Sequence, residues 1–455
     1  MNLKTLLLAL AATAAAITAH AGADTLATVS GRVIDAQSRQ PIPYAQLRIV
    51  GSNVGTQANI DGEYSLKIPR ALEPASIAVG CAGYRTDTLS QRALRRQHSV
   101  RLKPLEVTLH EVEVCEFMRP SALLKEVVRR IPDNYWCDTA IGTFFFRRYG
   151  LTSDSLYLFC EAIADIMRPG YDKQYHRKSG LIVVEMGNYD SIALAGNYKR
   201  YPLSRLLVYD TAMLRRMLGD TNYLRNPFAG RSQTVYDDRS AFFDILQDTR
   251  GSYWLSDKRG RVIDRRSKLT TYDDASGETY YLITYVTDRD SASILINHRD
   301  KALLHFYHTS LRPDTLMLPY PLNRFINGII SPYNRTHYEY AKIDGRYTLV
   351  FAMHASAYKI LSPKKSIVGG KINREIRNIL TDDVIEDCKL WSLIDMRHGD
   401  SMFIDSALVY SRETDLYYHD VLGHGSADDA FWQNYNTIPV ESRIAEKLRR
   451  KLATR

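Results

Sequence analysis

Between residues 29 and 102 the chain repeats short alternating segments that are separated by turn residues. In residues 45–49 and 64–68 an apolar side chain occupies every second position, which is the period of a half-buried strand. Residues 77–81 alternate in the same way. The dipeptide Asp61–Gly62 suits a tight hairpin because glycine accepts a positive φ without steric cost. Short strands at this spacing predict an antiparallel β-sandwich.

A set of glycine, aspartate, proline and tyrosine residues is spread over this segment. It consists of Gly31, Asp35, Pro43, Ala45, Gly55, Thr56, Asp61, Gly62, Tyr64, Gly83 and Tyr84. With this set the segment resembles the carboxypeptidase-regulatory-like domain, a transthyretin-type sandwich of the seven-stranded type, over roughly a sixth of the chain. Such a domain lies beside the catalytic domain of metallocarboxypeptidases without a catalytic group, and it extends many TonB-dependent outer-membrane receptors. The resemblance therefore implies a docking or spacer domain and no peptidase activity.

The first residues have the pattern of a signal peptide. Lys4 is followed by an apolar run over residues 6–17, and Ala19–Ala21 is a small-x-small cleavage site. No cysteine follows the run directly, which argues against lipoprotein processing. No later segment has the ~18 apolar residues that a spanning helix needs. We therefore expect export to the periplasm or the periplasmic face of the outer membrane, with no transmembrane segment after cleavage.

Charge and cysteine content constrain the partners only weakly. The net charge is +9, and the basic residues are scattered, so nucleic acid is excluded as the expected partner. An outer-membrane protein, a glycan or a lipid remains a predicted partner or ligand. The five cysteines, Cys81, Cys115, Cys137, Cys160 and Cys388, allow one or two disulfides or single buried thiols, and their spacing selects neither.

The rest of the sequence predicts a mainly β or α+β architecture. We divide the chain into a signal peptide (1–21), the sandwich (22–116), a β-rich α+β domain (117–375) and a C-terminal segment (376–455). Strands are expected at 143–149, 155–165, 181–186, 261–264, 279–287, 293–297, 302–308, 337–343 and 347–354. Helices are expected at 121–131, ended by Pro132, and at 206–218, 241–246 and 441–452.

The helix predicted at 441–452 has two interpretations. Ile444, Leu448 and Leu452 form one apolar stripe, and basic residues surround it. The helix could lie on an anionic membrane surface or pack its stripe against the domain. The stripe is narrow and purely aliphatic, which favours packing against the domain.

A second resemblance concerns the rest of the chain. Segments 145–147, 161–162, 280–283 and 294–297 with Ala302, and the ending 431–439, are similar to the uncharacterised region that follows the regulatory-like domain in a bacterial envelope family. The strand–turn–strand order is similar to the open curved sheet of periplasmic lipoprotein carriers. This likeness implies a fold but no activity.

Zinc is the first cofactor to test for a chain that resembles part of a carboxypeptidase. His110 and Glu113 have an H-x-x-E spacing, but residues three apart on a strand point to opposite faces. His305 and His308 fail for the same reason. His337 and Glu339 would share one face, but no cysteine pair follows to complete a deaminase-type site. None of these pairs predicts a metal site.

The remaining motifs are equally weak. His419, His424, Asp428 and Asp429 form the densest group of potential ligands, although a polar surface loop explains them without a metal. Ser362–Lys365 has an S-x-x-K spelling without its companion motifs. Val368–Lys371 lacks the spacing of a phosphate-binding loop. We therefore predict no catalytic, cofactor-binding or metal-binding residues.

These observations favour an exported, non-enzymatic envelope protein. The sandwich would serve as a docking or spacer domain, and the β-rich region would bind a ligand or partner. The alternative is an exported hydrolase of glycans or peptides, because two carboxylates ~5–10 Å apart can come from any two strands. Facing carboxylates in a deep cleft would favour the hydrolase.

Overall fold

The structure is a computed structural model, and it describes part of the chain. Within the described residues no helix is both long and apolar enough to cross a membrane. The described residues are 26–104, 119–138, 140–152, 156–168, 170–171, 175–178, 181–184, 198–209, 244–246, 254–255, 260–273, 277–310, 314–316, 326–363, 384–397 and 435–453.

The N-terminal part is a sandwich of two sheets, with strand orders β4-β1-β7 and β3-β2-β5-β6. Its elements are β1 (Ala27–Asp35), β2 (Gln46–Ile49), β3 (Gly55–Gln57), β4 (Glu63–Ile68), η1 (Arg70–Leu72), β5 (Ser76–Gly80), β6 (Asp87–Ser90), α2 (Gln91–Arg96) and β7 (Ser99–Leu102). The apolar positions of the alternating segments meet between the sheets as one buried cluster. The predicted seven-stranded sandwich is confirmed, but it is not wholly antiparallel, because β1 and β7 pair in parallel.

Several residues of the recognised set have visible structural roles. Gly62 has a φ of +75°, and a Cβ there would lie 2.4 Å from the Val33 carbonyl oxygen. Asp35 accepts backbone hydrogen bonds from Gln37 and Ser38, both at 2.7 Å, and a hydroxyl hydrogen bond from Tyr84 at 3.0 Å. These contacts close the turn after β1 and tie it to the end of the sandwich core. These residues of the recognised set therefore form turns and hold the sandwich together.

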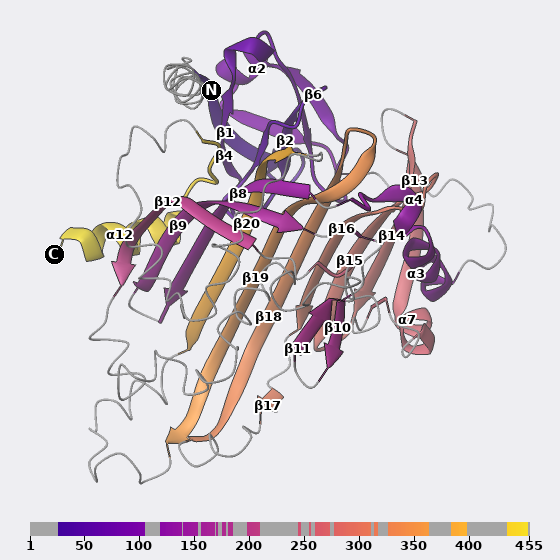
Figure 1. Ribbon diagram of the computed structural model, residues 1–455, viewed down its shortest axis with the longest axis vertical. Helices are drawn as coiled ribbons and strands as arrows, with labels where there is room; N and C mark the ends of the chain where they lie inside the picture. Colours follow the sequence, from indigo (N-terminus) through magenta and orange to yellow (C-terminus); the bar gives the residue numbers. More distant parts are fainter. Residues whose placement is uncertain are drawn as a thin grey trace, which may run out of the picture.

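The second part of the chain forms one large sheet of eleven strands (Figure 1). Ten follow the order β12-β9-β8-β20-β19-β18-β16-β15-β14-β13, and β17 pairs with β18. The strands are β8 (Ala140–Leu151), β9 (Leu156–Arg168), β12 (Tyr198–Tyr209), β13 (Ser267–Asp273), β14 (Thr279–Val286), β15 (Asp290–Asn297), β16 (Leu303–Ser310), β17 (Asp314–Leu316), β18 (Ile326–Ile343), β19 (Arg346–Pro363) and β20 (Ile385–Arg397); β10 (Tyr175–Lys178) and β11 (Leu181–Val184) form a separate hairpin.

Every pairing in the large sheet is antiparallel, and most join strands that are consecutive in sequence. β18 and β19 form a long hairpin whose turn, Asp344–Gly345, has positive φ at both residues. Three pairings join strands that are not consecutive, namely β9 with β12, β16 with β18, and β8 with β20, which lies between β19 and β8. A strand from the predicted C-terminal segment therefore completes the sheet built by residues 140–363.

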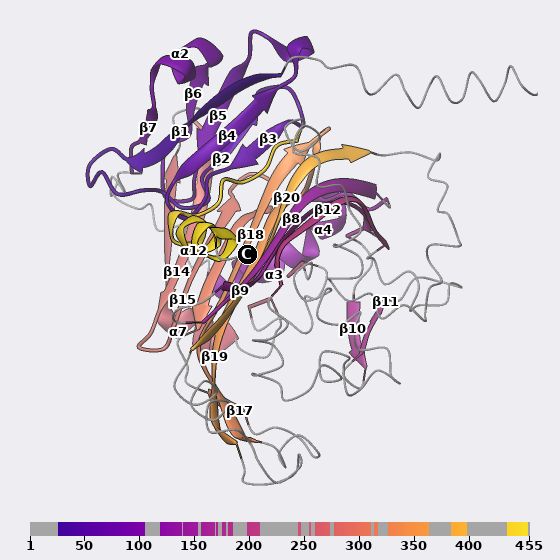
Figure 2. The same cartoon turned by 90° about the vertical axis from the view of Figure 1, so that its left-hand side faces the viewer.

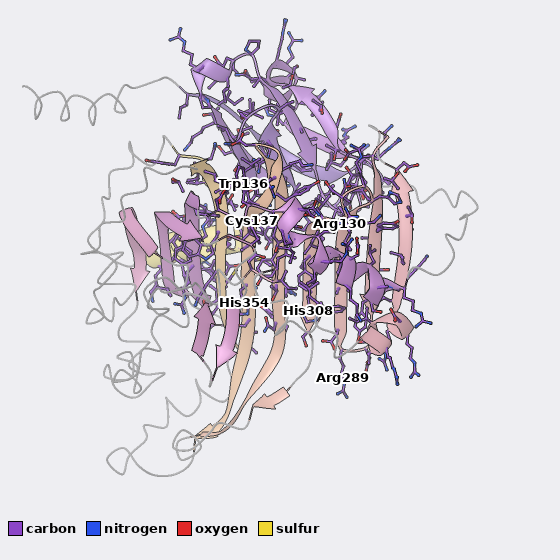
Figure 3. All side chains as sticks on the ribbon, turned by 45° about the vertical axis from the view of Figure 1, so that its right-hand side comes forward. Arg130, Trp136, Cys137, Arg289, His308 and His354 are labelled. Atoms are coloured by element: carbon purple, nitrogen blue, oxygen red, sulfur yellow. The ribbon has the colours of Figure 1, made fainter. Side chains whose placement is uncertain are left out.

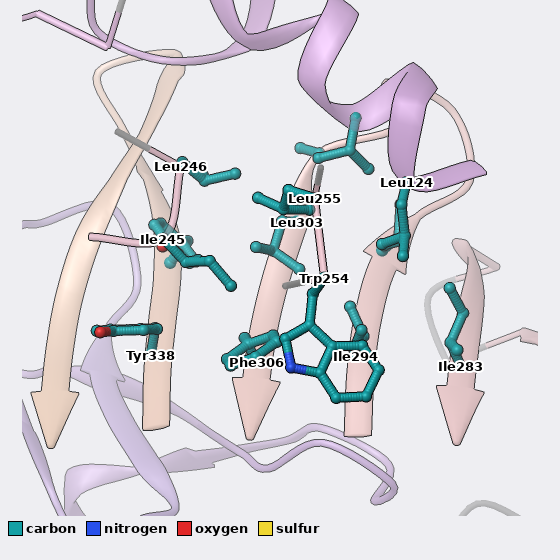
Figure 4. Packing of buried hydrophobic residues seen from close by; sticks show 14 of the residues in the cluster. Leu124, Ile245, Leu246, Trp254, Leu255, Ile283, Ile294, Leu303, Phe306 and Tyr338 are labelled. Atoms are coloured by element: carbon teal, nitrogen blue, oxygen red, sulfur yellow. The ribbon is translucent and has the colours of Figure 1, made fainter. Parts of the chain in front are cut away.

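The two faces of the sheet have different coverings (Figures 1 and 2). On the helix face, α3 (Pro120–Arg129), α4 (Ile131–Asn134), α7 (Gly260–Arg266) and residues 244–246 and 254–255 pack over an apolar cluster. Figure 4 shows Leu124, Leu246 and Trp254 of this layer above Ile294 and Phe306. The opposite face, the sandwich face, is covered by the sandwich and by α12 (Ser442–Ala453).

The orientation of α12 decides between the two interpretations of the terminal helix. Ile444 is buried against Leu151, Leu156 and Phe159, and Leu448 packs on the same cluster. The apolar stripe therefore packs against the sheet, as favoured from its narrow width.

Four local expectations are wrong in the described residues. Residues 206–209 belong to strand β12, because pairing with β9 overrides their helical spacing. Residues 244–246 are not helical. Residues 261–264 lie in helix α7, where Asp264 accepts hydrogen bonds from the Ser121 backbone and hydroxyl at the start of α3. Pro132 does not end the helical region, because it lies in the first turn of α4.

Candidate functional site at the sandwich–sheet interface

A group of polar side chains is buried on the sandwich face of the large sheet. His305 lies on β16 and is paired directly with Glu339 on β18. His337 lies two residues before Glu339, so its side chain is on the same face of the strand. Because cross-strand partners bring their Cβ atoms close together, the sheet places these side chains in one cluster. We call His305, His337 and Glu339 the His–Glu cluster.

The cluster is held together by short hydrogen bonds to one carboxylate oxygen. Glu339 Oε1 lies 2.6 Å from His305 Nδ1 and 2.5 Å from His337 Nε2. The side chains of the three residues are at most 8% exposed. Burial raises the pKa of Glu339, but the two histidines outweigh this and hold that pKa at about 2. Glu339 is therefore a buried carboxylate anion at neutral pH.

The sandwich supplies the cover of the cluster. Gln46 of β2 donates from Nε2 to Glu339 Oε2 at 3.0 Å. Tyr44, in the turn before β2, places its ring centroid 5.4 Å from those of both His337 and Phe351. Tyr44 has a φ of +57°, which is uncommon for a residue with a bulky side chain. The turn thus directs an aromatic side chain onto the cluster and excludes water from it.

The sequence analysis identified part of this arrangement. His337 and Glu339 share a face as predicted, and His305 and His308 diverge as predicted. His308 lies on the helix face, with its ring centroid 5.4 Å from that of Trp254 (Figure 3). The contact between His305 and Glu339 was not predicted, because strand period alone does not give the register between β16 and β18. The ligand atoms of the three residues lie within 4.8 Å of one another, which could hold a metal ion.

The other candidate residues lie largely outside the described part of the chain. This applies to His110, Glu113, His419, His424, Asp428, Asp429, Lys365 and the segment 368–371. The signal peptide and Cys115 also lie outside it. Of the described cysteines, Cys81, Cys137 and Cys388 are free thiols.

A second group of contacts joins the sandwich to the sheet through residues 435–441, which we call the C-terminal strap. Asn436 accepts a hydrogen bond from the Lys67 backbone at 2.7 Å and donates to the Lys67 carbonyl at 3.2 Å. The Asn436 amide thereby imitates a neighbouring strand at the edge strand β4. Immediately after the strap, the Ser442 backbone donates to Asp61 of the sandwich at 2.6 Å. The strap and the residue that follows it therefore contact the sandwich at two separate points.

On its other side the strap is fixed by Arg147 of β8. The Arg147 guanidinium donates to Glu161 at 2.7 Å and 2.9 Å, to the Ile438 carbonyl at 2.5 Å and to the Pro439 carbonyl at 3.1 Å. It also lies 4.0 Å from Glu441. Arg147 is 1% exposed, and its guanidinium lies over the rings of Phe145 and Phe159. The buried Arg147 guanidinium therefore binds Glu161 and the strap backbone, and it lies beside buried Glu441.

The described residues also line two surface hollows away from the cluster. One, of about 530 Å³, lies at the free end of the sandwich and is lined by Glu73, Pro74, Ala75, Ser90, Gln91, Arg92 and Arg95. The other, of about 360 Å³, is lined by Gly277, Glu278, Thr279, Asn297, His298, Arg299 and Lys301. Each has one carboxylate among these residues. Neither hollow has the facing carboxylate pair that a glycoside hydrolase needs.

An ion pair at the junction of β20 and β8 predicts a pH-dependent stability. Arg148 donates to Asp387 at 2.6 Å and 3.0 Å. Burial raises the pKa of Asp387, but Arg148 and Lys389 outweigh it and lower that pKa below its usual 3.8. A lowered carboxylate pKa gives stability that is present above pH ~4 and is lost as the pH falls through the folded-state value.

Replacing Arg148 by methionine is expected to cost about 2 kcal/mol of unfolding free energy at pH 6. The difference from the wild type should shrink as the pH falls from about 4 to 2, since Asp387 then becomes protonated in both proteins. Urea unfolding of both proteins at several pH values measures this difference in unfolding free energy. A difference that stays constant down to pH 2 would contradict the role given to Asp387.

Comparisons with known proteins agree with the N-terminal part of this description. The family model of the CarboxypepD_reg-like domain matches residues 29–114. No curated protein matches the chain. Among solved structures, a LolA superfamily protein from Nitrosomonas europaea aligns over 62% of this chain and 95% of its own, with 7% identity and a TM-score of 0.18. The likeness of the large sheet to lipoprotein carriers stays a prediction. The chain therefore contains a CarboxypepD_reg-like domain, matched over residues 29–114, and its described part is the seven-stranded sandwich with the turns that Gly62 and Asp35 close.

Proposed function

We propose that this is an exported envelope protein that binds a partner and catalyses no reaction. In this proposal the sandwich is a docking domain in a fixed position on the large sheet. The observation that carries it is the buried interface in which Gln46 and Tyr44 of the sandwich cover the His–Glu cluster. A domain that shares buried polar contacts with its neighbour cannot move as a free tether, because separation would leave those groups unpaired.

The free end of the sandwich is the surface that we assign to the partner. It carries the hollow between Pro74 and Arg95, and it lies on the side of the sandwich away from the large sheet (Figure 1). Arg92 and Arg95 outnumber Glu73, which pairs with Arg95 at 3.5 Å, so the rim of this hollow has a net positive charge that suits an acidic surface. The partner that we propose is an outer-membrane protein. A glycan or lipid is the other ligand class that the sequence predicts.

Site-specific photo-cross-linking in intact cells tests the proposal. A photoreactive residue at the exposed position Arg92 should capture one outer-membrane protein. The matched control is Arg289, whose side chain is 65% exposed on the large sheet and which lies far from the sandwich (Figure 3). Equal capture at both positions, or capture at neither, would argue against docking through the sandwich. Hydrolysis of glycans or peptides by the purified protein would favour the hydrolase instead.

A further inference from the structure

The His–Glu cluster offers more than hydrogen bonds between two domains. We propose that His305, His337 and Glu339 bind a divalent transition-metal ion of the zinc type in a structural site. The three ligand atoms come from two paired strands, so the sheet fixes their positions before any ion enters. They lie within 4.8 Å of one another, so small rotations of the side chains would bring them to the ~3.4 Å separations of a tetrahedral zinc site.

The donor set selects the class of metal. Two imidazole nitrogens and one carboxylate oxygen form a ligand set that zinc uses widely. Calcium and magnesium prefer shells made only of oxygen atoms, so this cluster suits them poorly. Cobalt, nickel and copper ions also accept imidazole, and in cells availability and geometry select among these metals.

The balance of charge supports a cation. Glu339 is buried, and its ion-pair partners among the described residues are His305 and His337. With both imidazoles neutral, the negative charge of buried Glu339 would be balanced only by hydrogen bonds, which is costly. A divalent ion that replaces the two ring protons facing Glu339 Oε1 would neutralise this charge. It would also relieve the crowding of two donors on one oxygen.

The surroundings indicate a structural site. Tyr44 and Phe351 pack against His337, and the side chains of the cluster are at most 8% exposed, which suits a structural site better than a catalytic one. Gln46 donates to Oε2 of Glu339, the carboxylate oxygen that the histidines do not contact, and would orient that ligand from the sandwich side. The ion would therefore bind beneath the docked sandwich, with a sandwich residue in its outer coordination shell.

The test measures metal bound by the full chain. The purified protein is freed of metal with a chelator and then titrated with Zn²⁺ by calorimetry, and bound zinc is measured by elemental analysis after gel filtration. We expect one tightly bound Zn²⁺ and a higher melting temperature with zinc than without it. Full loading that leaves the melting temperature unchanged, or a folded wild-type chain that retains no zinc, would overturn the proposal.

Variants assign the zinc to this cluster. His337→Ala and Glu339→Gln should lose the bound ion. Gln46→Ala should weaken Zn²⁺ binding about 10- to 100-fold, because it removes an outer-shell partner. His308→Ala is the matched control on the opposite face and should bind like the wild type. Loss of zinc in a His419→Ala/His424→Ala variant, with retention in His337→Ala, would place the ion elsewhere and reject the site. If His337→Ala fails to fold, Gln46→Ala and the wild-type zinc titration still decide the question.

Discussion

Replacing Arg147 by methionine is expected to lower the free energy of unfolding by about 3–5 kcal/mol. The side chains of Arg147 and Glu161 are each 1% exposed, and that of Glu441 is 4% exposed. Methionine fills a similar volume but leaves both carboxylates buried without their cation. It also removes the hydrogen bonds to the carbonyls of the C-terminal strap. Urea unfolding of the full chain measures the loss.

A matched control separates buried charge from charge in general. Arg443 pairs with Glu386 at the surface, and its side chain is 59% exposed. Arg443→Met should cost less than ~1 kcal/mol, since exposed ion pairs contribute little. Adding Glu161→Gln to Arg147→Met should restore part of the loss, because it removes one uncompensated charge. Similar losses in the two arginine variants would contradict the role assigned to Arg147.

The second large effect is expected from Ile438→Asp in the strap. Ile438 is buried against Phe145, Phe351 and Leu390 at the centre of the interface. Aspartate there removes an apolar contact worth about 2–5 kcal/mol and adds an unpaired charge, so the strap should leave the sheet. Hydrogen exchange should then accelerate at residues 436–444 and at β4, which the strap covers. The neighbouring Thr437→Asp is the control, because Thr437 is only partly buried. Unchanged exchange at β4 in Ile438→Asp would contradict this account of the strap.

Local sequence pattern predicted the sandwich well. Alternation in residues 45–49 and 64–68 and the Asp61–Gly62 turn give strands whose ends and apolar faces are set by neighbouring residues. The same holds for β13 to β16 and for β18 with β19, where consecutive strands pair through short turns such as Asp344–Gly345. In these two stretches of the large sheet each strand pairs with the next one along the chain, so a pattern over a few residues contains most of the information.

Long-range pairing was not predictable in this way. β20 pairs with β8 across more than 200 residues, and no local pattern indicates that partner. The His–Glu cluster has the same origin. Strand period correctly placed His337 and Glu339 on one face, but the register between β16 and β18 decides that His305 joins them. Arg147, in a run that reads as an ordinary strand, became a buried cation only because the strap supplies carbonyls from residues 438 and 439.

The sandwich, the strap and the sheet are expected to form a single folded unit, and the roles given to the interface residues depend on this. The direct measurement is to insert a specific protease site between residues 104 and 119, cleave the purified chain and separate the products by size-exclusion chromatography. The account predicts that the two fragments elute together at the position of the uncut protein, and that cleaved Ile438→Asp separates more readily. A wild-type sandwich that elutes alone after cleavage would contradict it.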